Sequence, residues 1–242
     1  VGDPTEQQAQ QGAKLCISIN GSPFHRNKPT QRDDLVSSRA QSNGVVVAYV
    51  NQIGGQDELV FDGGSMVADA RGVIQARAAT FAEDLLVCEV NAQGDVVCVS
   101  PQHEVERASS ELERVHAALV LGTRDYVKKN GFTDVVIGLS GGIDSALVAA
   151  IAVEALGAEH VHGVSMPSRY SSDGSKDDAL ALAENLNIPY QSVPIEPAFA
   201  AYLSMLEEGF AGKAEDLTEE NLQSRVRGMI LMALSNKHGW MV

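Results

Sequence analysis

The chain has 242 residues, of which 44% are hydrophobic and 21% are charged, as in an ordinary soluble globular protein. Its net charge of −14 argues against non-specific binding to nucleic acid or an anionic membrane, because both need a basic face. The chain also has no apolar run long enough to span a membrane and no signal peptide at its start, so we expect a cytoplasmic protein that binds neither nucleic acid nor a membrane.

The first part of the chain predicts an α/β unit rich in strands. Short apolar, β-branched runs bounded by Gly, Asn or Asp predict strands at 14–20, 44–53, 61–70 and 85–90. A helix is predicted between the first two strands, because Leu35, Val36 and Ala40 share one helical face. Gly44 then supplies the stop that a helix C-terminus favours.

A polar, aperiodic stretch at 99–107 separates this part from the next. Such a stretch is typical of a connection between domains. We therefore place the domain boundary here, with one domain at 1–105 and a second at 106–242.

The second part alternates strands with helices. Strands are predicted at 134–140, 160–167 and 188–195, and helices at 111–130, 145–157 and 175–187. This order predicts a doubly wound parallel sheet, Rossmann-like, with helices on both faces and a ligand at the carboxyl ends of the strands. The helix at 145–157 is apolar on nearly all sides, which predicts a buried helix, and Ser175 is the expected N-cap of the third helix.

The sequence GLSGGIDSA joins the strand at 134–140 to the following helix. Gly141 and Gly142 allow a sharp turn, and the backbone N–H groups of such a turn and of a helix N-terminus can hold an anion. Ser140 and Ser145 would add hydroxyl donors. Asp144 would repel a phosphate unless a cation lay between them, so the pattern predicts Mg²⁺ with Asp144 as its ligand.

The string SGGIDS resembles the pyrophosphate-binding loop of the ATP-pyrophosphatase family, whose fold is adenine-nucleotide alpha-hydrolase-like. The resemblance implies that ATP is cleaved between its α- and β-phosphates, giving AMP and pyrophosphate. It implies ATP contacts along the loop, at Gly138, Leu139, Ser140, Gly141, Gly142, Ile143, Asp144 and Ser145.

Two further segments indicate which member of that family the chain resembles. The stretches SINGSPFHRNKPTQR (18–32) and NQIGGQDELVFDGGS (51–65) resemble late parts of a nitrilase-type glutaminase domain, an α/β sandwich. A nitrilase-like part ahead of SGGIDS is the arrangement of glutamine-dependent NAD synthetases. The resemblance implies glutamine binding by Ser22 and Lys28, at their six-residue spacing; a Ser-Pro turn and a surface lysine are the alternative.

The segment EENLQSRVRGMI (219–230) resembles the part of NAD synthetases whose Asn and Arg hold deamido-NAD. On a helix, Asn221 and Arg225 face the same way and could hold a phosphate or a carboxylate, although a surface helix with its own salt bridges would look the same. Arg227 points elsewhere and receives no role.

The loop after the second strand of the sheet should border the nucleotide. Arg169 could reach a phosphate there, and Ser171, Ser172 and Ser175 could line the site. A flexible polar loop is the alternative interpretation.

The resemblance implies a carbon–nitrogen ligase of NAD biosynthesis that amidates deamido-NAD through an NAD-adenylate, with ammonia supplied from glutamine. We expect a homo-oligomer that uses ATP, Mg²⁺, deamido-NAD and glutamine or ammonia. In the family the glutaminase Cys, Glu and Lys precede SINGSPF, so we expect them upstream of Val1 and expect this chain alone, incomplete at both ends, to be inactive. Cys16, Cys88 and Cys98 fit small buried thiols in a reducing cytosol, and no zinc site is expected.

Three other functions stay open. An ATP-pyrophosphatase amidotransferase or tRNA thiolase with another acceptor would share SGGIDS, although RNA binding conflicts with the acidic charge. A stand-alone amidase would not need residues 130–242. A nucleotide-binding fragment without activity would keep the fold alone.

Overall fold

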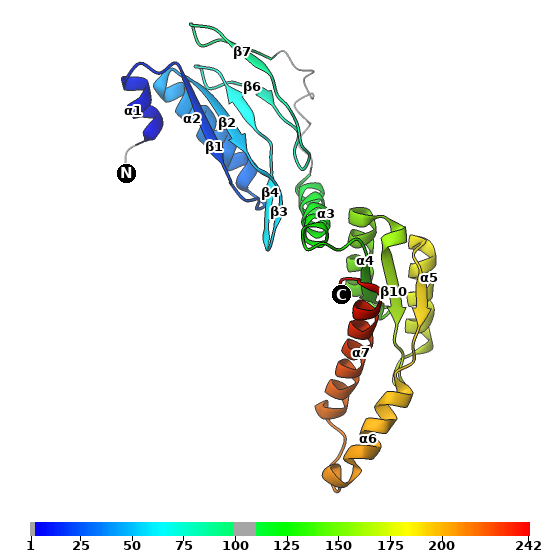
Figure 1. The fold of residues 1–242 in the computed structure, drawn as a ribbon. Helices are drawn as coiled ribbons and strands as arrows, with labels where there is room; N and C mark the ends of the chain where they lie inside the picture. The colour runs from blue at the N-terminus through cyan, green and yellow to red at the C-terminus, as the bar shows by residue number, and fades with distance from the viewer. Residues whose placement is uncertain (1–2, 99–109) are drawn as a thin grey trace. The chain divides into compact units, whose positions relative to one another are not determined.

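The chain forms two compact units in a computed structural model that describes residues 3–98 and 110–242 (Figure 1). Unit 1 comprises the described residues of 1–125 and unit 2 comprises 126–242, so the division falls within helix α3 (Glu111–Lys129). The predicted boundary between residues 105 and 106 lies outside the described residues. Both units mix helices and strands, which confirms the predicted α/β class.

Unit 1 is built on a mixed four-stranded sheet. Its elements are α1 (Pro4–Gln10), β1 (Leu15–Asn20), α2 (Lys28–Asn43), β2 (Val46–Asn51), β3 (Ile53–Gln56), β4 (Leu59–Asp62), β5 (Met66–Ala68), β6 (Ile74–Arg77), β7 (Cys88–Val90) and β8 (Val96–Cys98). The strand order is β1-β2-β5-β6, with β1 and β2 parallel and the other pairs antiparallel. Strands β3 and β4 form one separate hairpin, and β7 and β8 form another.

Helix α2 covers one face of this sheet (Figure 1). It buries Val36 and Ala40 against the strands, as predicted, and ends at Gly44, whose φ of 63° is the left-handed C-terminal conformation. Leu35 departs from the prediction and is 45% exposed. On β1 the side chains alternate as in any strand, so Cys16 is buried while Ile17 is exposed.

Two of the predicted strands are each divided in the structure. The run at 44–53 supplies β2 and the start of β3, with Gln52 between them. The run at 61–70 is interrupted by Gly63 and Gly64, both at positive φ, which end β4 before β5 begins. Strands β6 and β8 and helix α1 are too short to leave a periodic signal in the sequence.

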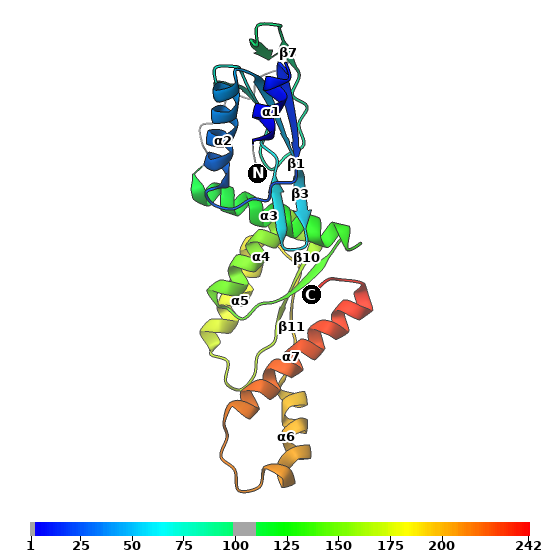
Figure 2. The same ribbon diagram turned by 90° about the vertical axis from the view of Figure 1, so that its left-hand side faces the viewer.

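Unit 2 contains a three-stranded parallel sheet in the order β11-β10-β9. Its elements after α3 are β9 (Val135–Gly138), α4 (Ile143–Leu156), a 3-10 turn η1 (Ala158–His160), β10 (Val161–Ser165), α5 (Asp173–Leu186), β11 (Tyr190–Ser192), α6 (Glu196–Phe210) and α7 (Leu217–His238). Helix α6 leads away from the sheet and α7 returns to it (Figure 2).

Helices cover both faces of this sheet, as the doubly wound prediction requires. Val135 packs with the α4 and α5 residues Ala149 and Ala179 on one face. The neighbouring Val136 points the other way and packs with Val226 of α7. The alternation along β9 therefore divides the apolar core of unit 2 into two layers.

Two details of the helices differ from the sequence predictions. Helix α4 is not buried all round: it buries a narrow alanine face, while Ile143, Leu147 and Val148 are exposed. The apolar composition of α4 predicted burial on all sides, but composition alone does not show how many sides of a helix are covered by neighbouring elements. The N-cap of α5 is Ser172 rather than Ser175, because the Ser172 hydroxyl accepts the Ser175 N–H.

No helix among the described residues is both long and apolar enough to cross a membrane.

Asp69, in the turn between β5 and β6, is a buried carboxylate held by several donors. It accepts hydrogen bonds from the backbone N–H of Arg71 at 2.9 Å and of Val73 at 3.0 Å, and from the Gln75 amide at 2.8 Å. Burial alone would raise the pKa of Asp69, but these hydrogen bonds outweigh it and lower the pKa to about 2.

We expect Asp69 to make the stability of the protein depend on pH in acid. Because the folded pKa lies below that of the unfolded chain, the carboxylate stabilises the fold above about pH 4, and this contribution is lost as the pH falls toward 2. Urea titrations of wild type and Asp69→Asn between these pH values measure the effect. An equally steep loss of unfolding free energy in the variant would contradict it.

Candidate functional site

The loop between β9 and α4 is fixed by its own serines. The Ser145 hydroxyl donates to the Gly142 carbonyl at 3.0 Å and lies 3.1 Å from the Ser140 hydroxyl, which accepts the Gly142 N–H at 3.2 Å. These hydroxyls therefore stabilise the loop from within, whereas the sequence suggested donors to a ligand. The first backbone N–H groups of α4, which begins at Ile143, have no partner within the helix and face outward from its N-terminus.

Gly141 lies against the first turn of α5. Its φ of 79° is a left-handed conformation, and a Cβ built on it would lie 2.3 Å from the Ser175 carbonyl oxygen. That distance is far below van der Waals contact, so only glycine fits both the turn and the approach of the neighbouring backbone. The close contact sets the position of the loop relative to α5.

Leu139 anchors the start of the loop in the core. Its N–H donates to the Val164 carbonyl of β10 at 2.8 Å, and its side chain is 2% exposed. A Cβ on Gly163 would lie only 2.7 Å from the Leu139 side chain, so the leucine occupies the space that the glycine leaves. Leu139 thus positions the loop, and its amide is already used.

A cavity of ≈ 530 Å³ lies at the carboxyl ends of β9 and β10. It is lined by Gly138, Leu139, Ser140, Ser165, Met166, Pro167, Ser171, Ser175, Lys176, Ser224, Arg227, Gly228 and Leu231. Hydroxyl groups and two cations supply its polar surface, and no carboxylate is among these described residues. Such a lining favours a ligand that carries phosphate groups.

The cavity brings together part of the predicted nucleotide site. Gly138, Leu139 and Ser140 line it, as do Ser171 and Ser175 from the loop after β10. The rest of the predicted ATP contacts, Gly141, Gly142, Ile143, Asp144 and Ser145, continue from the cavity wall into the first turn of α4.

Arg169 does not line this cavity. Its guanidinium pairs with Glu196, at 2.9 Å through Nε, and lies 5.7 Å from the centroid of the Phe199 ring. This pairing leaves it without a free charge for a phosphate.

Arg227 is a cavity residue that the sequence analysis passed over. Its Nε donates to the Met166 carbonyl at 3.1 Å, and burial lowers the pKa of its guanidinium. A signal was present in the sequence, because Ser224, Arg227, Gly228 and Leu231 follow the i, i+3, i+4, i+7 spacing of one helix face, and all four line the cavity.

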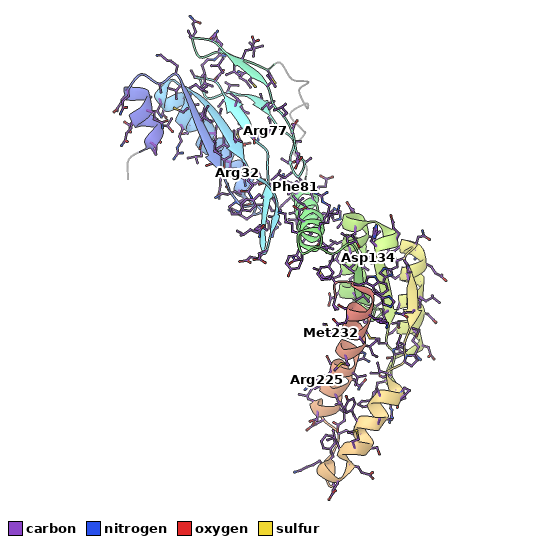
Figure 3. All side chains as sticks on the ribbon, viewed as in Figure 1. Arg32, Arg77, Phe81, Asp134, Arg225 and Met232 are labelled. Atoms are coloured by element: carbon purple, nitrogen blue, oxygen red, sulfur yellow. The ribbon has the colours of Figure 1, made fainter. Side chains whose placement is uncertain are left out.

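Asn221 and Arg225 are both exposed on α7, and Figure 3 labels Arg225. The Arg225 guanidinium donates to the backbone carbonyl of Asn221 at 3.3 Å, and pairing of the two side chains on one ligand stays a prediction. Neither residue lines the cavity.

Asp144 has the properties that a magnesium ligand at this loop requires. It lies exposed in the first turn of α4, and in the described parts of the chain no hydrogen bond or ion pair engages its carboxylate. The described residues hold no group of three or more His, Cys, Asp or Glu side chains arranged for a metal. One carboxylate that shares the ion with phosphate oxygens and water is how Mg²⁺ is commonly bound, so the residue fits.

Unit 1 contains a second cavity, of ≈ 630 Å³, and both predicted glutamine contacts line it. Ser22 follows β1 and Lys28 begins α2. The Ser22 N–H donates to Asn51 Oδ1 at 2.9 Å, which fixes the backbone at this corner of the cavity. The structure thus brings the two residues together, and glutamine binding itself stays a prediction.

Arg32 of α2 stabilises the turn at Ser22 and Pro23 through hydrogen bonds. Its guanidinium donates to the Ser22 hydroxyl at 3.2 Å, to the Ser22 carbonyl at 3.0 Å and to the Pro23 carbonyl at 3.3 Å. The same group donates to Asp62 at 2.8 Å, and both charged side chains are almost completely buried. Arg32 was not predicted, because nothing in its spacing separates it from a surface arginine.

Cys16 and Cys88 do not have the character of an activated nucleophile. Burial is the main cause that raises the pKa of Cys16 above its ordinary value. Burial and a hydrogen bond with Cys98 raise the pKa of Cys88 to about 11. A thiol with a raised pKa is protonated near neutral pH and reacts slowly, which suits the expectation that the glutaminase nucleophile lies elsewhere.

Fold and site together define an α/β protein with a glycine loop and a polar cavity at the carboxyl ends of a doubly wound parallel sheet. The family model described as NAD synthase matches residues 115–242, and the model described as carbon–nitrogen hydrolase matches residues 7–94. The NAD synthase match spans more than half of the chain, and the chain belongs to this family.

Curated relatives agree with this family. The chain is 42% identical to the glutamine-dependent NAD(+) synthetase of Thermotoga maritima, over 100% of this chain and 48% of the relative. It is 49% identical to that of Xylella fastidiosa, over 94% of this chain and 42% of the relative. The chain therefore spans about half the length of the curated relatives it matches.

A solved structure matches the fold of nearly the whole chain. The glutamine-dependent NAD+ synthetase of Acinetobacter baumannii, in complex with ADP, aligns with a TM-score of 0.90 and 39% identity. The alignment covers 97% of this chain and 44% of that one.

We expect Gly141→Ala to weaken nucleotide binding by displacing the loop from α5. Gly131→Ala is the matched control, because Gly131 has a similar φ of 82° with nothing within 4 Å of an added Cβ. Both variants should lose about 1–2 kcal/mol of stability from the left-handed backbone, and Gly141→Ala should lose more, because its Cβ must also displace the Ser175 backbone. Only Gly141→Ala should also lose ATP affinity by calorimetry, and equal affinity in the two variants would contradict the role given to the contact.

We expect Arg32→Met to lower the free energy of unfolding by about 3–5 kcal/mol, because it leaves the Asp62 carboxylate buried without its partner. The double variant Arg32→Met/Asp62→Leu removes both charges and should recover part of that loss. Chemical denaturation measures both variants. A double variant no more stable than the single one would show that the ion pair is not the cause.

Proposed function

We propose that the full-length protein converts deamido-NAD to NAD, using ATP and ammonia released from glutamine. Unit 2 would bind ATP, with its phosphates at residues 138–145 and in the adjoining cavity. The observation that carries the proposal is that cavity, where the glycine loop meets Lys176 and Arg227 and no carboxylate is part of the described lining. The bound ADP in the Acinetobacter baumannii relative supports the same assignment.

The proposed chemistry needs a negatively charged group to approach a triphosphate. The nicotinate carboxylate of deamido-NAD attacks the α-phosphorus, pyrophosphate leaves, and a mixed anhydride with AMP forms. Ammonia then attacks the anhydride carbonyl and displaces AMP. The cationic side chains of Lys176 and Arg227 and the N–H groups at the start of α4 would reduce the repulsion in the first step. Mg²⁺, held by Asp144 when bound, would neutralise further phosphate charge.

Ammonia would come from glutamine bound by unit 1 at Ser22 and Lys28, which share a cavity. The glutaminase Cys, Glu and Lys would lie in the part of the protein outside this chain. For deamido-NAD we propose Asn221 and Arg225, whose exposed side chains are open to a ligand or to a second subunit. We further propose a homo-oligomer in the cytoplasm, in keeping with the sparse cysteines and acidic charge.

Asp144→Asn in the full-length protein should reduce pyrophosphate release at least about 100-fold, with glutamine or with ammonia as the nitrogen source. The neutral amide would remove the only charge at the loop suited to Mg²⁺. Asp178→Asn, an exposed position on α5, is the control and should leave the rate unchanged. Turnover of Asp144→Asn within threefold of wild type would exclude the carboxylate as a metal ligand.

Arg225→Ala and Arg227→Ala should affect the KM values of different substrates. We expect Arg225→Ala to raise the KM for deamido-NAD about 10- to 100-fold, from the loss of one charge-assisted contact, with glutamine hydrolysis unchanged. Arg227→Ala should mainly raise the KM for ATP, because Arg227 shares a cavity with the glycine loop. Should Arg225→Ala affect only ATP, the assignment of α7 to deamido-NAD would be wrong.

A further inference from the structure

The β7–β8 hairpin of unit 1 is closed by a turn that its first residue organises. The Asn91 side-chain oxygen accepts the N–H of Gln93 at 3.0 Å and of Asp95 at 2.9 Å, while the Asn91 N–H donates to the Asp95 carbonyl at 3.1 Å. The turn also contacts the main sheet, because the Ala70 N–H donates to the Gly94 carbonyl at 3.4 Å. These contacts fix how the two strands pair.

The resulting register places Cys88 directly opposite Cys98. Asn91 and Asp95 form a hydrogen-bonded pair, and hydrogen-bonded and non-hydrogen-bonded pairs alternate along antiparallel strands. Counting outward from the turn makes Cys88 and Cys98 a non-hydrogen-bonded pair, the type in which facing side chains approach most closely. The Cα atoms of such pairs lie about 4.5 Å apart, within the range that a disulfide spans.

Other observations confirm that the two thiols are neighbours. The Cys98 thiol lies 3.7 Å from the Val87 carbonyl, beside Cys88, and its proximity is one cause of the raised pKa of the Cys88 thiol, after burial. Both cysteines are reduced in the structure and half-buried, so a small molecule can approach them from solvent. Cys16, in contrast, is 6% exposed and lies in the core between α2 and the sheet.

We propose that Cys88 and Cys98 form a reversible thiol–disulfide site that is oxidised by small disulfides of the glutathione type. One cysteine thiolate attacks the glutathione disulfide, forming a mixed disulfide and releasing one glutathione thiolate. The second cysteine loses its proton, attacks the protein sulfur and displaces the second glutathione. Two electrons pass from the protein to the oxidant, and the products are one cross-strand disulfide and two glutathione thiols.

The site should react slowly near neutral pH. Each cysteine attacks once in this sequence, so the thiolate of Cys88 is needed in one of the two steps. Its pKa of about 11 keeps it protonated at pH 7, and thiol–disulfide exchange proceeds through the thiolate. The oxidation rate should therefore rise with pH, which sets this site apart from a low-pKa reactive cysteine.

Trypsin makes the pair simple to assay in the full-length protein. No Lys or Arg lies between Arg77 and Arg107, so both cysteines fall in one peptide, while Cys16 falls in the peptide between Lys14 and Arg26. After treatment with glutathione disulfide, remaining thiols are alkylated in denaturant and the digest is analysed by mass spectrometry. We expect the first peptide to lose two hydrogens and carry neither alkyl group nor glutathione, and the Cys16 peptide to be alkylated.

Single variants distinguish a paired site from independent thiols. In Cys88→Ser and in Cys98→Ser the remaining cysteine should be alkylated or carry glutathione, and no internal disulfide can form. Asn91→Ala, which removes the acceptor that holds the turn, should slow the closing step severalfold relative to formation of the mixed disulfide. Dithiothreitol should return the wild-type peptide to its doubly alkylated form.

Three results would overturn the proposal. The first is a wild-type peptide alkylated at both cysteines after treatment at about pH 9, where exchange is favoured. The second is glutathione on one or both cysteines without ring closure. The third is a disulfide from Cys88 or Cys98 to a different cysteine, which would mean that the cross-strand pair is not the reactive unit.

Discussion

The approach of Gly141 to the backbone of Ser175 is the constraint on which the position of the glycine loop depends. A loop that binds anions through backbone N–H groups must keep those groups aimed outward without a ligand to hold them. Here the loop is held from two directions, by α5 against Gly141 and by β10 against the Leu139 amide. The serines then tie it to the start of α4. The loop is therefore held in place by contacts within the protein, and under the proposed function little conformational entropy would be lost when ATP binds.

In unit 1, buried charged and polar side chains hold the turn at Ser22 in place. The Ser22 corner would be a mobile turn if only its own backbone held it, but Arg32 and Asn51 supply donors and an acceptor from neighbouring elements. Placing Arg32 next to Asp62 in the interior is costly unless each is fully paired, and this makes one arrangement much better than the alternatives. A short loop beside each cavity is thus held in place by a different interaction. In unit 2 it is a close steric contact, and in unit 1 it is a network of buried charged and polar groups.

Local patterns were enough to predict the parallel sheet, helix α2 with its Gly44 stop, and the strand–loop–helix unit around the glycines, because each follows from periodicity or from a turn that only certain residues allow. Helical spacing also predicted that Asn221 and Arg225 face the same way, and a joint role for the two side chains stays a prediction. Helical spacing groups Arg227 with Ser224 on one face of α7, but only contacts distant in sequence, such as that with Met166, show that this face lines the cavity. The exposed side of α4 was missed for the same reason. Hydrophobicity states what a residue would gain by burial, but tertiary contacts decide whether it is buried.

The contact between Leu139, just after β9, and Gly163 of β10 joins two positions distant in sequence into a single shared volume. A side chain at 163 would occupy the space now filled by the leucine, and a smaller residue at 139 would leave a void beside the loop. Selection should therefore act on the pair rather than on either site alone. Among relatives, an alanine at position 163 should be accompanied by a residue smaller than leucine at position 139. The two positions would then change together, next to the cavity at the carboxyl ends of β9 and β10.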